Sequence, residues 1–479
     1  MNPSDFSEQH SEDKWVLSLT MKRHLRKLTG IGVLLLMLTG CANYGFPRNL
    51  PAPDSSVDEK YSLHQWASAH NDKDVRLILT FSGGGTRAAA LSYGVLQELR
   101  DTTVNLDGNE SRLLDEIDYI SSVSGGSFTS AYYGLHGDGI FENFENDFLR
   151  YDLEKHLLLR AINPLLLFSR KGRTQSAIEY YQKFLFHDVT FADMIRPDRP
   201  MIIINASDLA YGIRFSFIQE YFDLLCSDLS TFPVAEAVAA SSAVPVLFDP
   251  VVVQNHDTCS DMQLRGPAAL DEADEYYQGE NLPALISQLK TYGNKDKRKF
   301  VHFVDGGITD NLGLRALSDT LTASGGAKGA RKRIISKGEK TPRHIVVITV
   351  NAATASEAGM DSSVKNPSAV HTVSAVTKLQ LARFDEDSML MIKDNLRSMA
   401  EELSTPEQPV NTHFINVSIQ DVEKPDILEF LNKIPTSFSL SDDQVDQLIE
   451  SGRVILRNNP EFKNLVQDLT KRYVKEAVT

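Results

Sequence analysis

The sequence lacks the short motifs that bind nucleotide phosphates, catalytic zinc or calcium. It has no G-x-x-x-x-G-K-[ST] motif, which argues against a P-loop nucleotide site. It has no H-E-x-x-H motif either, and the acidic run 271–275 lacks the glycine spacing of an EF-hand loop. We therefore expect no metal and no cofactor.

Basic residues are also in short supply. The chain has 49 Lys and Arg against 64 Asp and Glu, which gives a formal net charge of -15. Because nucleic-acid binding depends on Lys and Arg at the phosphates, an acidic chain of this kind is a poor candidate for it. Broad electrostatic attraction to an anionic lipid surface is not expected for the same reason. Contact with a membrane would have to be hydrophobic or covalent.

The apolar run 31–38 near the N-terminus is too short to span a bilayer. It follows a basic run that opens at Met21 and precedes a Leu-Thr-Gly-Cys sequence that ends at Cys41. This order is typical of a secretory signal, so we expect translation to start at Met21. The cysteine resembles that of the bacterial lipobox, which implies that Cys41 is lipidated and becomes the first mature residue. A plain signal peptide or a buried apolar helix is the alternative.

The lipobox resemblance also carries a prediction of location. Ala42 follows the cysteine in place of the aspartate that is linked to inner-membrane retention. We therefore expect a lipid-anchored protein of the cell envelope, in the outer membrane and facing the periplasm. If Cys41 carries lipid, Cys226 and Cys259 remain as an even pair in an oxidising compartment and can form a disulfide. Two buried free thiols are the alternative.

The apolar patterns of the remaining chain predict an α/β fold. Nearly continuous apolar runs that alternate with helical patterns indicate a mostly parallel central sheet flanked by helices in three layers. A helical C-terminal extension follows, and Ser441 with Gln444 forms a capping-box pattern at the start of its last helix. The predicted strands are 75–81, 117–123, 201–205, 300–304, 345–350 and 414–419. The predicted segments are a signal and lipobox (1–41), a tether (42–72), a catalytic domain (73–355) and an extension packed on the same domain (356–479).

Two further segments leave alternatives open. Residues 153–168 are rich in leucine and flanked by basic residues, which fits a lid, a membrane-facing segment or a core helix broken by Pro164. Residues 328–343 are basic and rich in turn-forming residues. We read this stretch as a solvated surface loop before any role in binding lipid headgroups.

Three glycines, Gly83, Gly84 and Gly85, connect the first strand directly to a helix. A junction of this type presents backbone N–H groups that favour an anion, either a phosphate or the oxyanion of acyl transfer. Gly83, Gly85 and Ala88 satisfy the dinucleotide fingerprint, which is a weak signal when it stands alone. The second strand ends in serines and lacks the acid that would hold a ribose, so the oxyanion interpretation is favoured.

The second strand ends in Ser-Val-Ser-Gly-Gly, residues 122–126, which nearly matches the G-x-S-x-G nucleophile elbow. A sharp turn from strand to helix lifts the central serine, Ser124, out of the sheet and requires small neighbours. Ser122 stands where the motif has its first glycine, and this weakens the match without removing it.

Four blocks occur in an order that resembles the patatin-like phospholipase family. They are Gly-Gly-Gly-Thr-Arg (83–87), Ser-Val-Ser-Gly-Gly (122–126), Ala-Ser-Ser-Ala-Val-Pro (240–245) and Asp-Gly-Gly (305–307). The resemblance implies a Ser–Asp dyad without histidine, with Ser124 as nucleophile and Asp305 as general base. It further implies an oxyanion hole at Gly83 to Gly85 that Arg87 supports, and it extends to Pro-Thr-Ser-Phe at 435–438.

A dyad places an unusual demand on its aspartate. Asp305 must itself take the serine proton, and a carboxylate with an ordinary pKa near 4 is a weak base for this step. Burial beside Phe303 and Val304 would raise the pKa of Asp305. His302 lies on the opposite face of the strand by alternation, so we interpret it as structural.

The sequence thus predicts a lipid-anchored serine hydrolase that cleaves acyl esters of phospholipids or other lipids through an acyl-enzyme. Two alternatives remain: a non-catalytic envelope lipoprotein that binds lipid in the same pocket, and an acyltransferase that uses the same dyad. The expected partners are the lipid substrate and, through the anchor, a membrane. The oligomeric state is left open.

Overall fold

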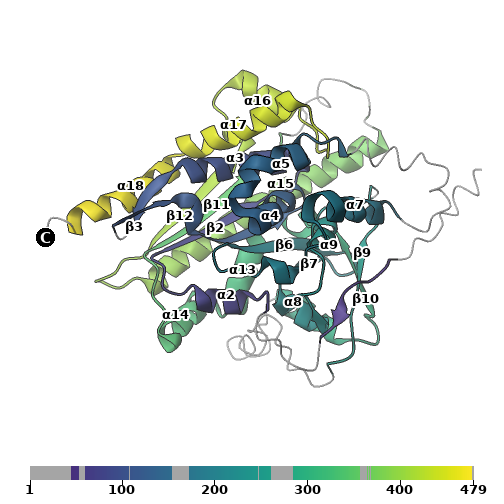
Figure 1. Cartoon of the computed structure of the whole chain (residues 1–479), viewed down its shortest axis with the longest axis horizontal. Helices are drawn as coiled ribbons and strands as arrows, with labels where there is room; N and C mark the ends of the chain where they lie inside the picture. The colour runs from purple at the N-terminus through teal and green to yellow at the C-terminus, as the bar shows by residue number, and fades with distance from the viewer. Residues whose placement is uncertain are drawn as a thin grey trace, which may run out of the picture. The chain divides into compact units, whose positions relative to one another are not determined.

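An eight-stranded sheet forms the centre of the protein in the computed structural model (Figure 1). The structure describes residues 45–52, 60–106, 108–153, 172–245, 247–259, 284–355, 364, 366 and 368–476. Along the sheet, the strands are β12 (Asn411–Ser418), β11 (His344–Asn351), β2 (Val75–Phe81), β5 (Ile117–Val123), β6 (Met201–Asp208), β10 (Phe300–Val304) and β9 (Val251–Gln254), and β7 (Ile213–Ser216) also pairs with β6. The shorter pairs are β1 (Leu50–Pro51) with β8 (Ser227–Asp228), and β3 (Thr103–Leu106) with β4 (Asn109–Arg112).

The predicted α/β fold with a mostly parallel sheet is confirmed for the run from β12 to β6, whose neighbouring strands are all parallel. Strands β10, β9 and β7 are antiparallel to their neighbours. Strand β10 meets β6 in only two residue pairs, Val304 with Ser207 and Phe303 with Asp208. As a result, the chain after β10 reaches the edge of the sheet where β5 ends.

Helices cover both faces of the sheet, and the alternation of side chains along β11 shows why. Val346 and Ile348 join the large hydrophobic cluster on one face, whereas Ile345 and Val347 join a smaller cluster on the other. The first cluster includes side chains of α3 (Thr86–Asp101), α4 (Gly125–His136), α9 (Val234–Ser241), α17 (Asp442–Asn458) and α18 (Pro460–Glu476). The second includes side chains of α13 (Leu314–Ala323), α14 (Gly326–Lys337) and α15 (Ala369–Leu403). The remaining α-helices in the described ranges are α2 (Leu63–Ala69), α5 (Ile140–Phe144), α7 (Arg173–Tyr181), α8 (Gln219–Leu224), α11 (Ala284–Lys290), α12 (Gly307–Asp310) and α16 (Pro425–Asn432).

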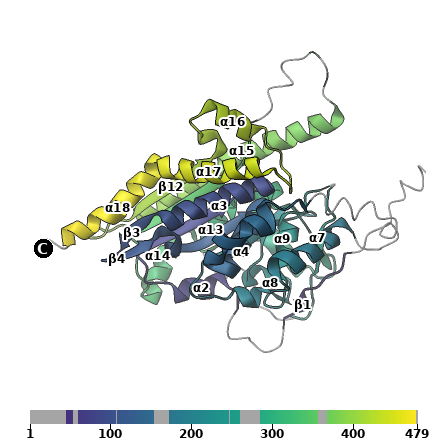
Figure 2. The ribbon, with the colours of Figure 1, turned by 45° about the horizontal axis from the view of Figure 1, so that its top comes forward.

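The C-terminal extension is built into the domain. Its strand β12 is the edge of the central sheet, and helix α17 lies along α3 (Figure 2). A Cβ at Gly94 would lie 2.1 Å from the carbonyl oxygen of Ile449, so glycine is needed for the two helices to approach this closely. The capping box predicted from Ser441 and Gln444 is confirmed at the start of α17.

Two predictions about the chain outside the sheet are wrong. The predicted tether, 42–72, includes helix α2 and a buried Tyr61, whose hydroxyl donates to the carbonyl of Ile202 at 2.9 Å. The polar composition of the segment concealed these few anchoring side chains. The predicted surface loop at 328–343 contains most of helix α14, because Ala330 and Ile334 provide a buried face.

Some predictions fall outside the described residues. These are the signal segment with the lipobox at Cys41, most of the leucine-rich stretch 153–168, and the acidic run 271–275. No helix within the described ranges is both long enough and apolar enough to cross a membrane.

Cys226 and Cys259 form a disulfide, with their Cα atoms 5.6 Å apart. The Cys226→Ser, Cys259→Ser double variant is expected to lose about 3–4 kcal/mol of unfolding free energy, because the bridge restricts the unfolded chain. Urea denaturation of both proteins measures the difference. Reductant should lower the midpoint of the wild-type protein and leave that of the double variant unchanged. An equal effect on both would contradict the prediction.

Candidate active site

Ser124 occupies the turn between β5 and α4 with a φ of 49°, an unusual value for a residue other than glycine. Its neighbours explain why this turn forms. A Cβ at Gly125 would lie 2.0 Å from the carbonyl oxygen of Gly85, and one at Gly126 would lie 2.6 Å from the Cβ of Phe81. The turn after β5 therefore packs directly against the turn after β2, and only glycine fits at positions 125 and 126.

Ser122, which replaces the first glycine of the elbow motif, is accommodated below the turn. Its side chain is buried and accepts a hydrogen bond from the hydroxyl of Ser130 at 2.6 Å. Ser130 belongs to helix α4, which begins directly after Ser124. The serine at position 122 thus adds a contact between β5 and α4 and does not obstruct Ser124.

Ser124 and Asp305 meet although 181 positions separate them in the chain. The Oγ of Ser124 donates to the Oδ2 of Asp305 at 2.8 Å, and the backbone N–H of Gly307 donates to Oδ1, also at 2.8 Å. Burial raises the pKa of Asp305 to about 6, and the hydrogen bonds from Gly307 and Ser124 lower it in part. His302 is exposed on the other face of β10. The pair can therefore pass a proton without a histidine between its members.

The small-residue block 240–245 packs against the backbone of this pair. Ser241 accepts a hydrogen bond from the N–H of Ser124 at 2.9 Å and donates to the carbonyl of Asn205 at 2.6 Å. The N–H of Asp305 donates to the carbonyl of Ala243 at 2.9 Å. One short segment thus fixes the backbone of both Ser124 and Asp305.

The three glycines of the first turn are not equivalent, which corrects the prediction that all three donate to an oxyanion. The N–H of Gly83 donates to the carbonyl of Asn311 at 3.0 Å and is not available. The N–H groups of Gly84, Gly85 and Gly125 donate to no group in the described part of the chain. Gly84 and Gly85 have φ values of 139° and 62°, which favour glycine. The available donors are therefore two glycines of the first turn and one of the second.

Arg87 anchors this turn to distant parts of the chain. Its guanidinium is buried and donates to the carbonyls of Ala352 at 2.9 Å and Ile434 at 2.7 Å, and to the hydroxyl of Thr436 at 3.1 Å. Burial lowers the pKa of Arg87 to about 10. All three acceptors are neutral, so the positive charge beside Gly84 is left uncompensated by them. Arg87 thus positions the turn and adds a favourable potential for an anion there.

The motif 435–438 contacts the same turn. The N–H of Thr86 donates to the carbonyl of Ser437 at 2.9 Å, and a Cβ at Gly85 would lie 2.4 Å from that carbonyl oxygen. The sequence marked this motif only through its family resemblance. Its structural role is to pack against Gly85 and to accept the backbone N–H that follows the glycine turn.

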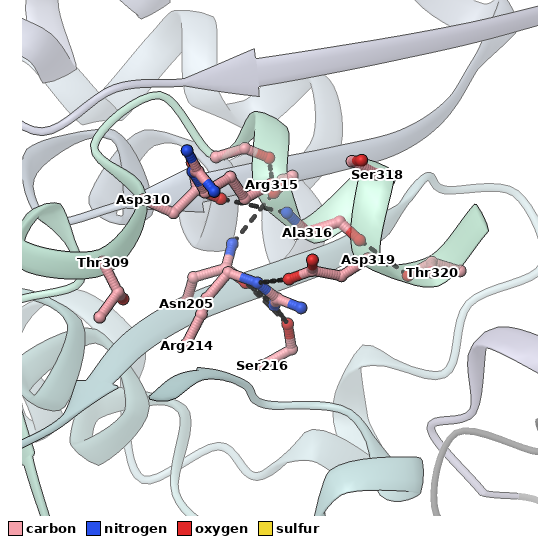
Figure 3. A network of polar contacts seen from close by, with 12 residues as sticks. Asn205, Arg214, Ser216, Thr309, Asp310, Arg315, Ala316, Ser318, Asp319 and Thr320 are labelled. Carbon is pink, nitrogen blue, oxygen red and sulfur yellow. Dashed lines mark hydrogen bonds and ion pairs between the residues drawn. The ribbon is translucent and has the colours of Figure 1, made fainter. Parts of the chain in front are cut away.

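A buried polar network supports the nucleophile turn from the side of β7 (Figure 3). Arg214 donates to the carboxylate of Asp319 at 2.8 Å and to the side-chain oxygen of Asn205 at 3.1 Å. The amide of Asn205 in turn donates to the carbonyl of Ser122 at 3.1 Å. The network therefore connects helix α13 to the strand end that carries Ser124, and sequence reasoning missed it because its members lie on four separate elements.

Sequence reasoning also missed Asn311 as part of the site. Its carbonyl holds Gly83, and its side-chain amide donates to Asp385 of α15 at 2.8 Å. Burial raises the pKa of Asp385 to about 7. The neighbouring Asp310 accepts from the N–H of Ala316 at 3.1 Å in the first turn of α13, as expected for a helix cap.

No group of three or more His, Cys, Asp or Glu side chains that could hold a metal ion occurs among the residues with described positions. The turns after β2 and β5 and the end of β10 bring together a hydroxyl, a buried carboxylate and backbone N–H donors. Such a set can perform nucleophilic acyl transfer.

In comparisons with known proteins, residues 79–318 match the family described as patatin-like phospholipase. Among solved structures, human GIVD cytosolic phospholipase A2 in complex with methyl gamma-linolenyl fluorophosphonate matches at 11% identity and a TM-score of 0.40, over 89% of this chain and 69% of that one. A further structure of human GIVD cytosolic phospholipase A2 matches at 12% identity and a TM-score of 0.36, over 89% of this chain and 71% of that one. No curated protein matches the chain.

Proposed function

The chain belongs to the patatin-like phospholipase family and is a lipid esterase, and from that premise we propose that it cleaves acyl esters through an acyl-enzyme formed at Ser124. One observation carries the proposal: the Oγ of Ser124 donates to the buried carboxylate of Asp305 at 2.8 Å. The nearby N–H donors of Gly84, Gly85 and Gly125 support it.

In the proposed first step, Asp305 accepts the proton of Ser124 while Oγ attacks the ester carbonyl carbon. The negative charge that develops on the carbonyl oxygen is stabilised by the free N–H groups, each worth about 3–4 kcal/mol in such sites. Asp305 then gives its proton to the leaving alcohol, and the C–O ester bond breaks. Water attacks the acyl-enzyme next, Asp305 takes its proton, and the free fatty acid leaves as Ser124 is reprotonated.

The rate of this reaction is expected to rise with pH and to reach half its plateau near pH 6. Asp305 must be ionised to accept the serine proton, and burial raises its pKa to about 6. Measuring kcat/KM on a soluble ester from about pH 4 to about pH 8 tests this, because kcat/KM reports groups of the free enzyme. A midpoint near pH 4, the value of an exposed carboxyl, would contradict the role of Asp305.

A fluorophosphonate probe followed by mass spectrometry tests the proposal most directly. We expect a single adduct on the peptide that contains Ser124 and loss of esterase activity in proportion to labelling. An intact protein that neither reacts nor hydrolyses esters would instead be the lipid-binding lipoprotein. Product analysis with added alcohols separates hydrolysis, which releases fatty acid, from acyl transfer, which forms a new ester.

We also propose that Cys41 carries lipid and anchors the enzyme in the outer membrane, facing the periplasm. The lipobox pattern supports this, and the acidic composition leaves a covalent anchor as the simplest route to a membrane. The substrate would then be phospholipid or another acyl-ester lipid within reach of the anchor. Cys41→Ser is expected to abolish incorporation of labelled palmitate, and fractionation should then find the protein released from membranes.

A further inference from the structure

A cavity lies on the side of the sheet that α13 and α14 cover. It has a volume of about 420 Å³, which falls in the range of small-molecule sites. Ile203 of β6 lines it and pairs with Ser121 of β5, so at about 3.3 Å per residue the lining begins roughly 10 Å along the chain from Ser124. The lining includes neither member of the Ser124–Asp305 pair and none of the glycines with available N–H groups. It is therefore a separate site.

The walls of this cavity are mainly apolar. Ile78 and Ile203 line it from the sheet, Leu317 and Leu321 from α13, and Met399 from α15. None of these five side chains has a role in the proposed reaction. Such a lining favours an aliphatic chain.

The polar end of the cavity is basic. Lys332, Arg333 and Lys337 of α14 line it together with His64 of α2. Arg333 lies 3.6 Å from the carboxylate of Glu339, whereas the Nζ of Lys337 lies 3.3 Å from the Nε2 of His64 and pairs with no carboxylate in the described part of the chain. Helix α14 carries five Lys or Arg and no Asp or Glu, in a chain whose net charge is -15.

The two acids that line the cavity do not neutralise Lys337. Asp319 pairs with Arg214 at 2.8 Å, and Glu220 accepts from the hydroxyl of Ser62 at 2.7 Å and from the N–H of His64 at 3.0 Å. Arg214 neutralises Asp319, whereas Glu220 is held through Oε1 alone and its Oε2 has no hydrogen-bond partner in the described part of the chain; neither acid forms an ion pair with Lys337 there. An anionic head with an aliphatic chain complements what remains: a basic rim and an apolar interior.

We propose that this cavity binds a long-chain fatty acid, with the carboxylate at Lys337 and His64 and the chain against Ile78, Ile203 and Leu317. The proposal rests on the proposed function for the source of the ligand, because ester cleavage releases this class of molecule. The binding itself does not depend on catalysis. The enzyme would thus hold its own product at a site separate from the one that forms it.

Calorimetric titration of the folded Ser124→Ala protein with sodium dodecanoate tests the site. We expect saturable binding at one site that Lys337→Glu weakens about tenfold by charge reversal near the carboxylate. Lys328→Glu is the matched control, because it makes the same charge change on α14 outside the cavity lining and should leave binding unchanged. Dodecyltrimethylammonium, which has the same chain and a positive head, should bind more weakly than dodecanoate.

A second arm separates this cavity from the catalytic site. In wild-type protein labelled with a long-chain fluorophosphonate, dodecanoate binding should persist, whereas Ala67→Phe, which fills the cavity beside α2, should remove it. Loss of all binding on labelling, equal effects of Lys337→Glu and Lys328→Glu, or no saturable binding would overturn the proposal. Failure of the probe to label Ser124 would instead count against the proposed function, and the Lys337 and Lys328 variants would still report on the cavity.

Discussion

Ser124→Ala is expected to lower kcat for ester hydrolysis about 10⁴-fold, and Asp305→Asn to lower it by a similar factor. The first change removes the attacking oxygen, and the second removes the only carboxylate that the Oγ of Ser124 contacts in the described residues. Because the two groups act as one unit, the double variant should be about as inactive as either single variant. Steady-state rates on a soluble ester measure all three.

Folding controls make this result interpretable. Ser122→Ala removes a buried hydroxyl two positions away whose hydrogen-bond partners are Ser130 and the carbonyl of Ile203, not Ser124 or Asp305, so kcat should stay near that of the wild type. The pKa of Asp305 is raised in the folded protein, so its ionisation opposes folding at neutral pH. Asp305→Asn removes that ionisation and should melt no lower than the wild-type protein. Substantial hydrolysis by well-folded Asp305→Asn would exclude Asp305 as the base.

Gly85→Ala is expected to lower kcat by about 10²–10³-fold while KM changes little, the range seen when one oxyanion donor is lost. The residue has a φ of 62°, and a Cβ there would lie 2.4 Å from the carbonyl oxygen of Ser437. The turn must shift to relieve this contact, and the N–H groups of Gly84 and Gly85 shift with it. Kinetics on a soluble ester avoid effects from binding to lipid aggregates.

Gly212→Ala is the matched control for this change. Gly212 has a φ of 64°, nearly that of Gly85, but a Cβ there would meet nothing within 4 Å. The two variants share a positive φ, whereas Gly85→Ala adds the contact with Ser437 and a ψ of -148°, which lies in a region essentially limited to glycine. Equal kcat values for the two variants would show that the glycine turn does not supply the oxyanion donors.

Local patterns were enough to predict the parts of the site that lie on strand ends. Each of the four sequence blocks lies at or next to a turn that only small residues permit. The runs of glycine, serine and alanine at these turns can be recognised in the sequence. The meeting of Ser124 with Asp305 followed from the family resemblance. No pattern in the sequence indicated that β10 runs antiparallel to β6, because apolar alternation is the same in either direction.

The supporting contacts could not be predicted, because they join residues far apart in the chain and several of them use a backbone atom on one side. The backbone carbonyl of Asn311 accepts a hydrogen bond from the N–H of Gly83. Because every residue type has a backbone carbonyl, the identity of residue 311 does not indicate this contact. Arg87 is visible as a charge, but its acceptors at 352 and 434 leave no trace in composition. Helix α14 was misread for a related reason: its basic residues concealed the two side chains that bury it.

The contacts of Arg87 with residues 434–436 also have a consequence for biosynthesis. A chain that is still being made contains Ser124 and Asp305 long before the segment that holds the glycine turn exists. Such a nascent chain, or one truncated before residue 434, is expected to lack an ordered oxyanion site even when its sheet has begun to form. Ester cleavage would then begin only after residues 434–436 have been made and have packed against the glycine turn.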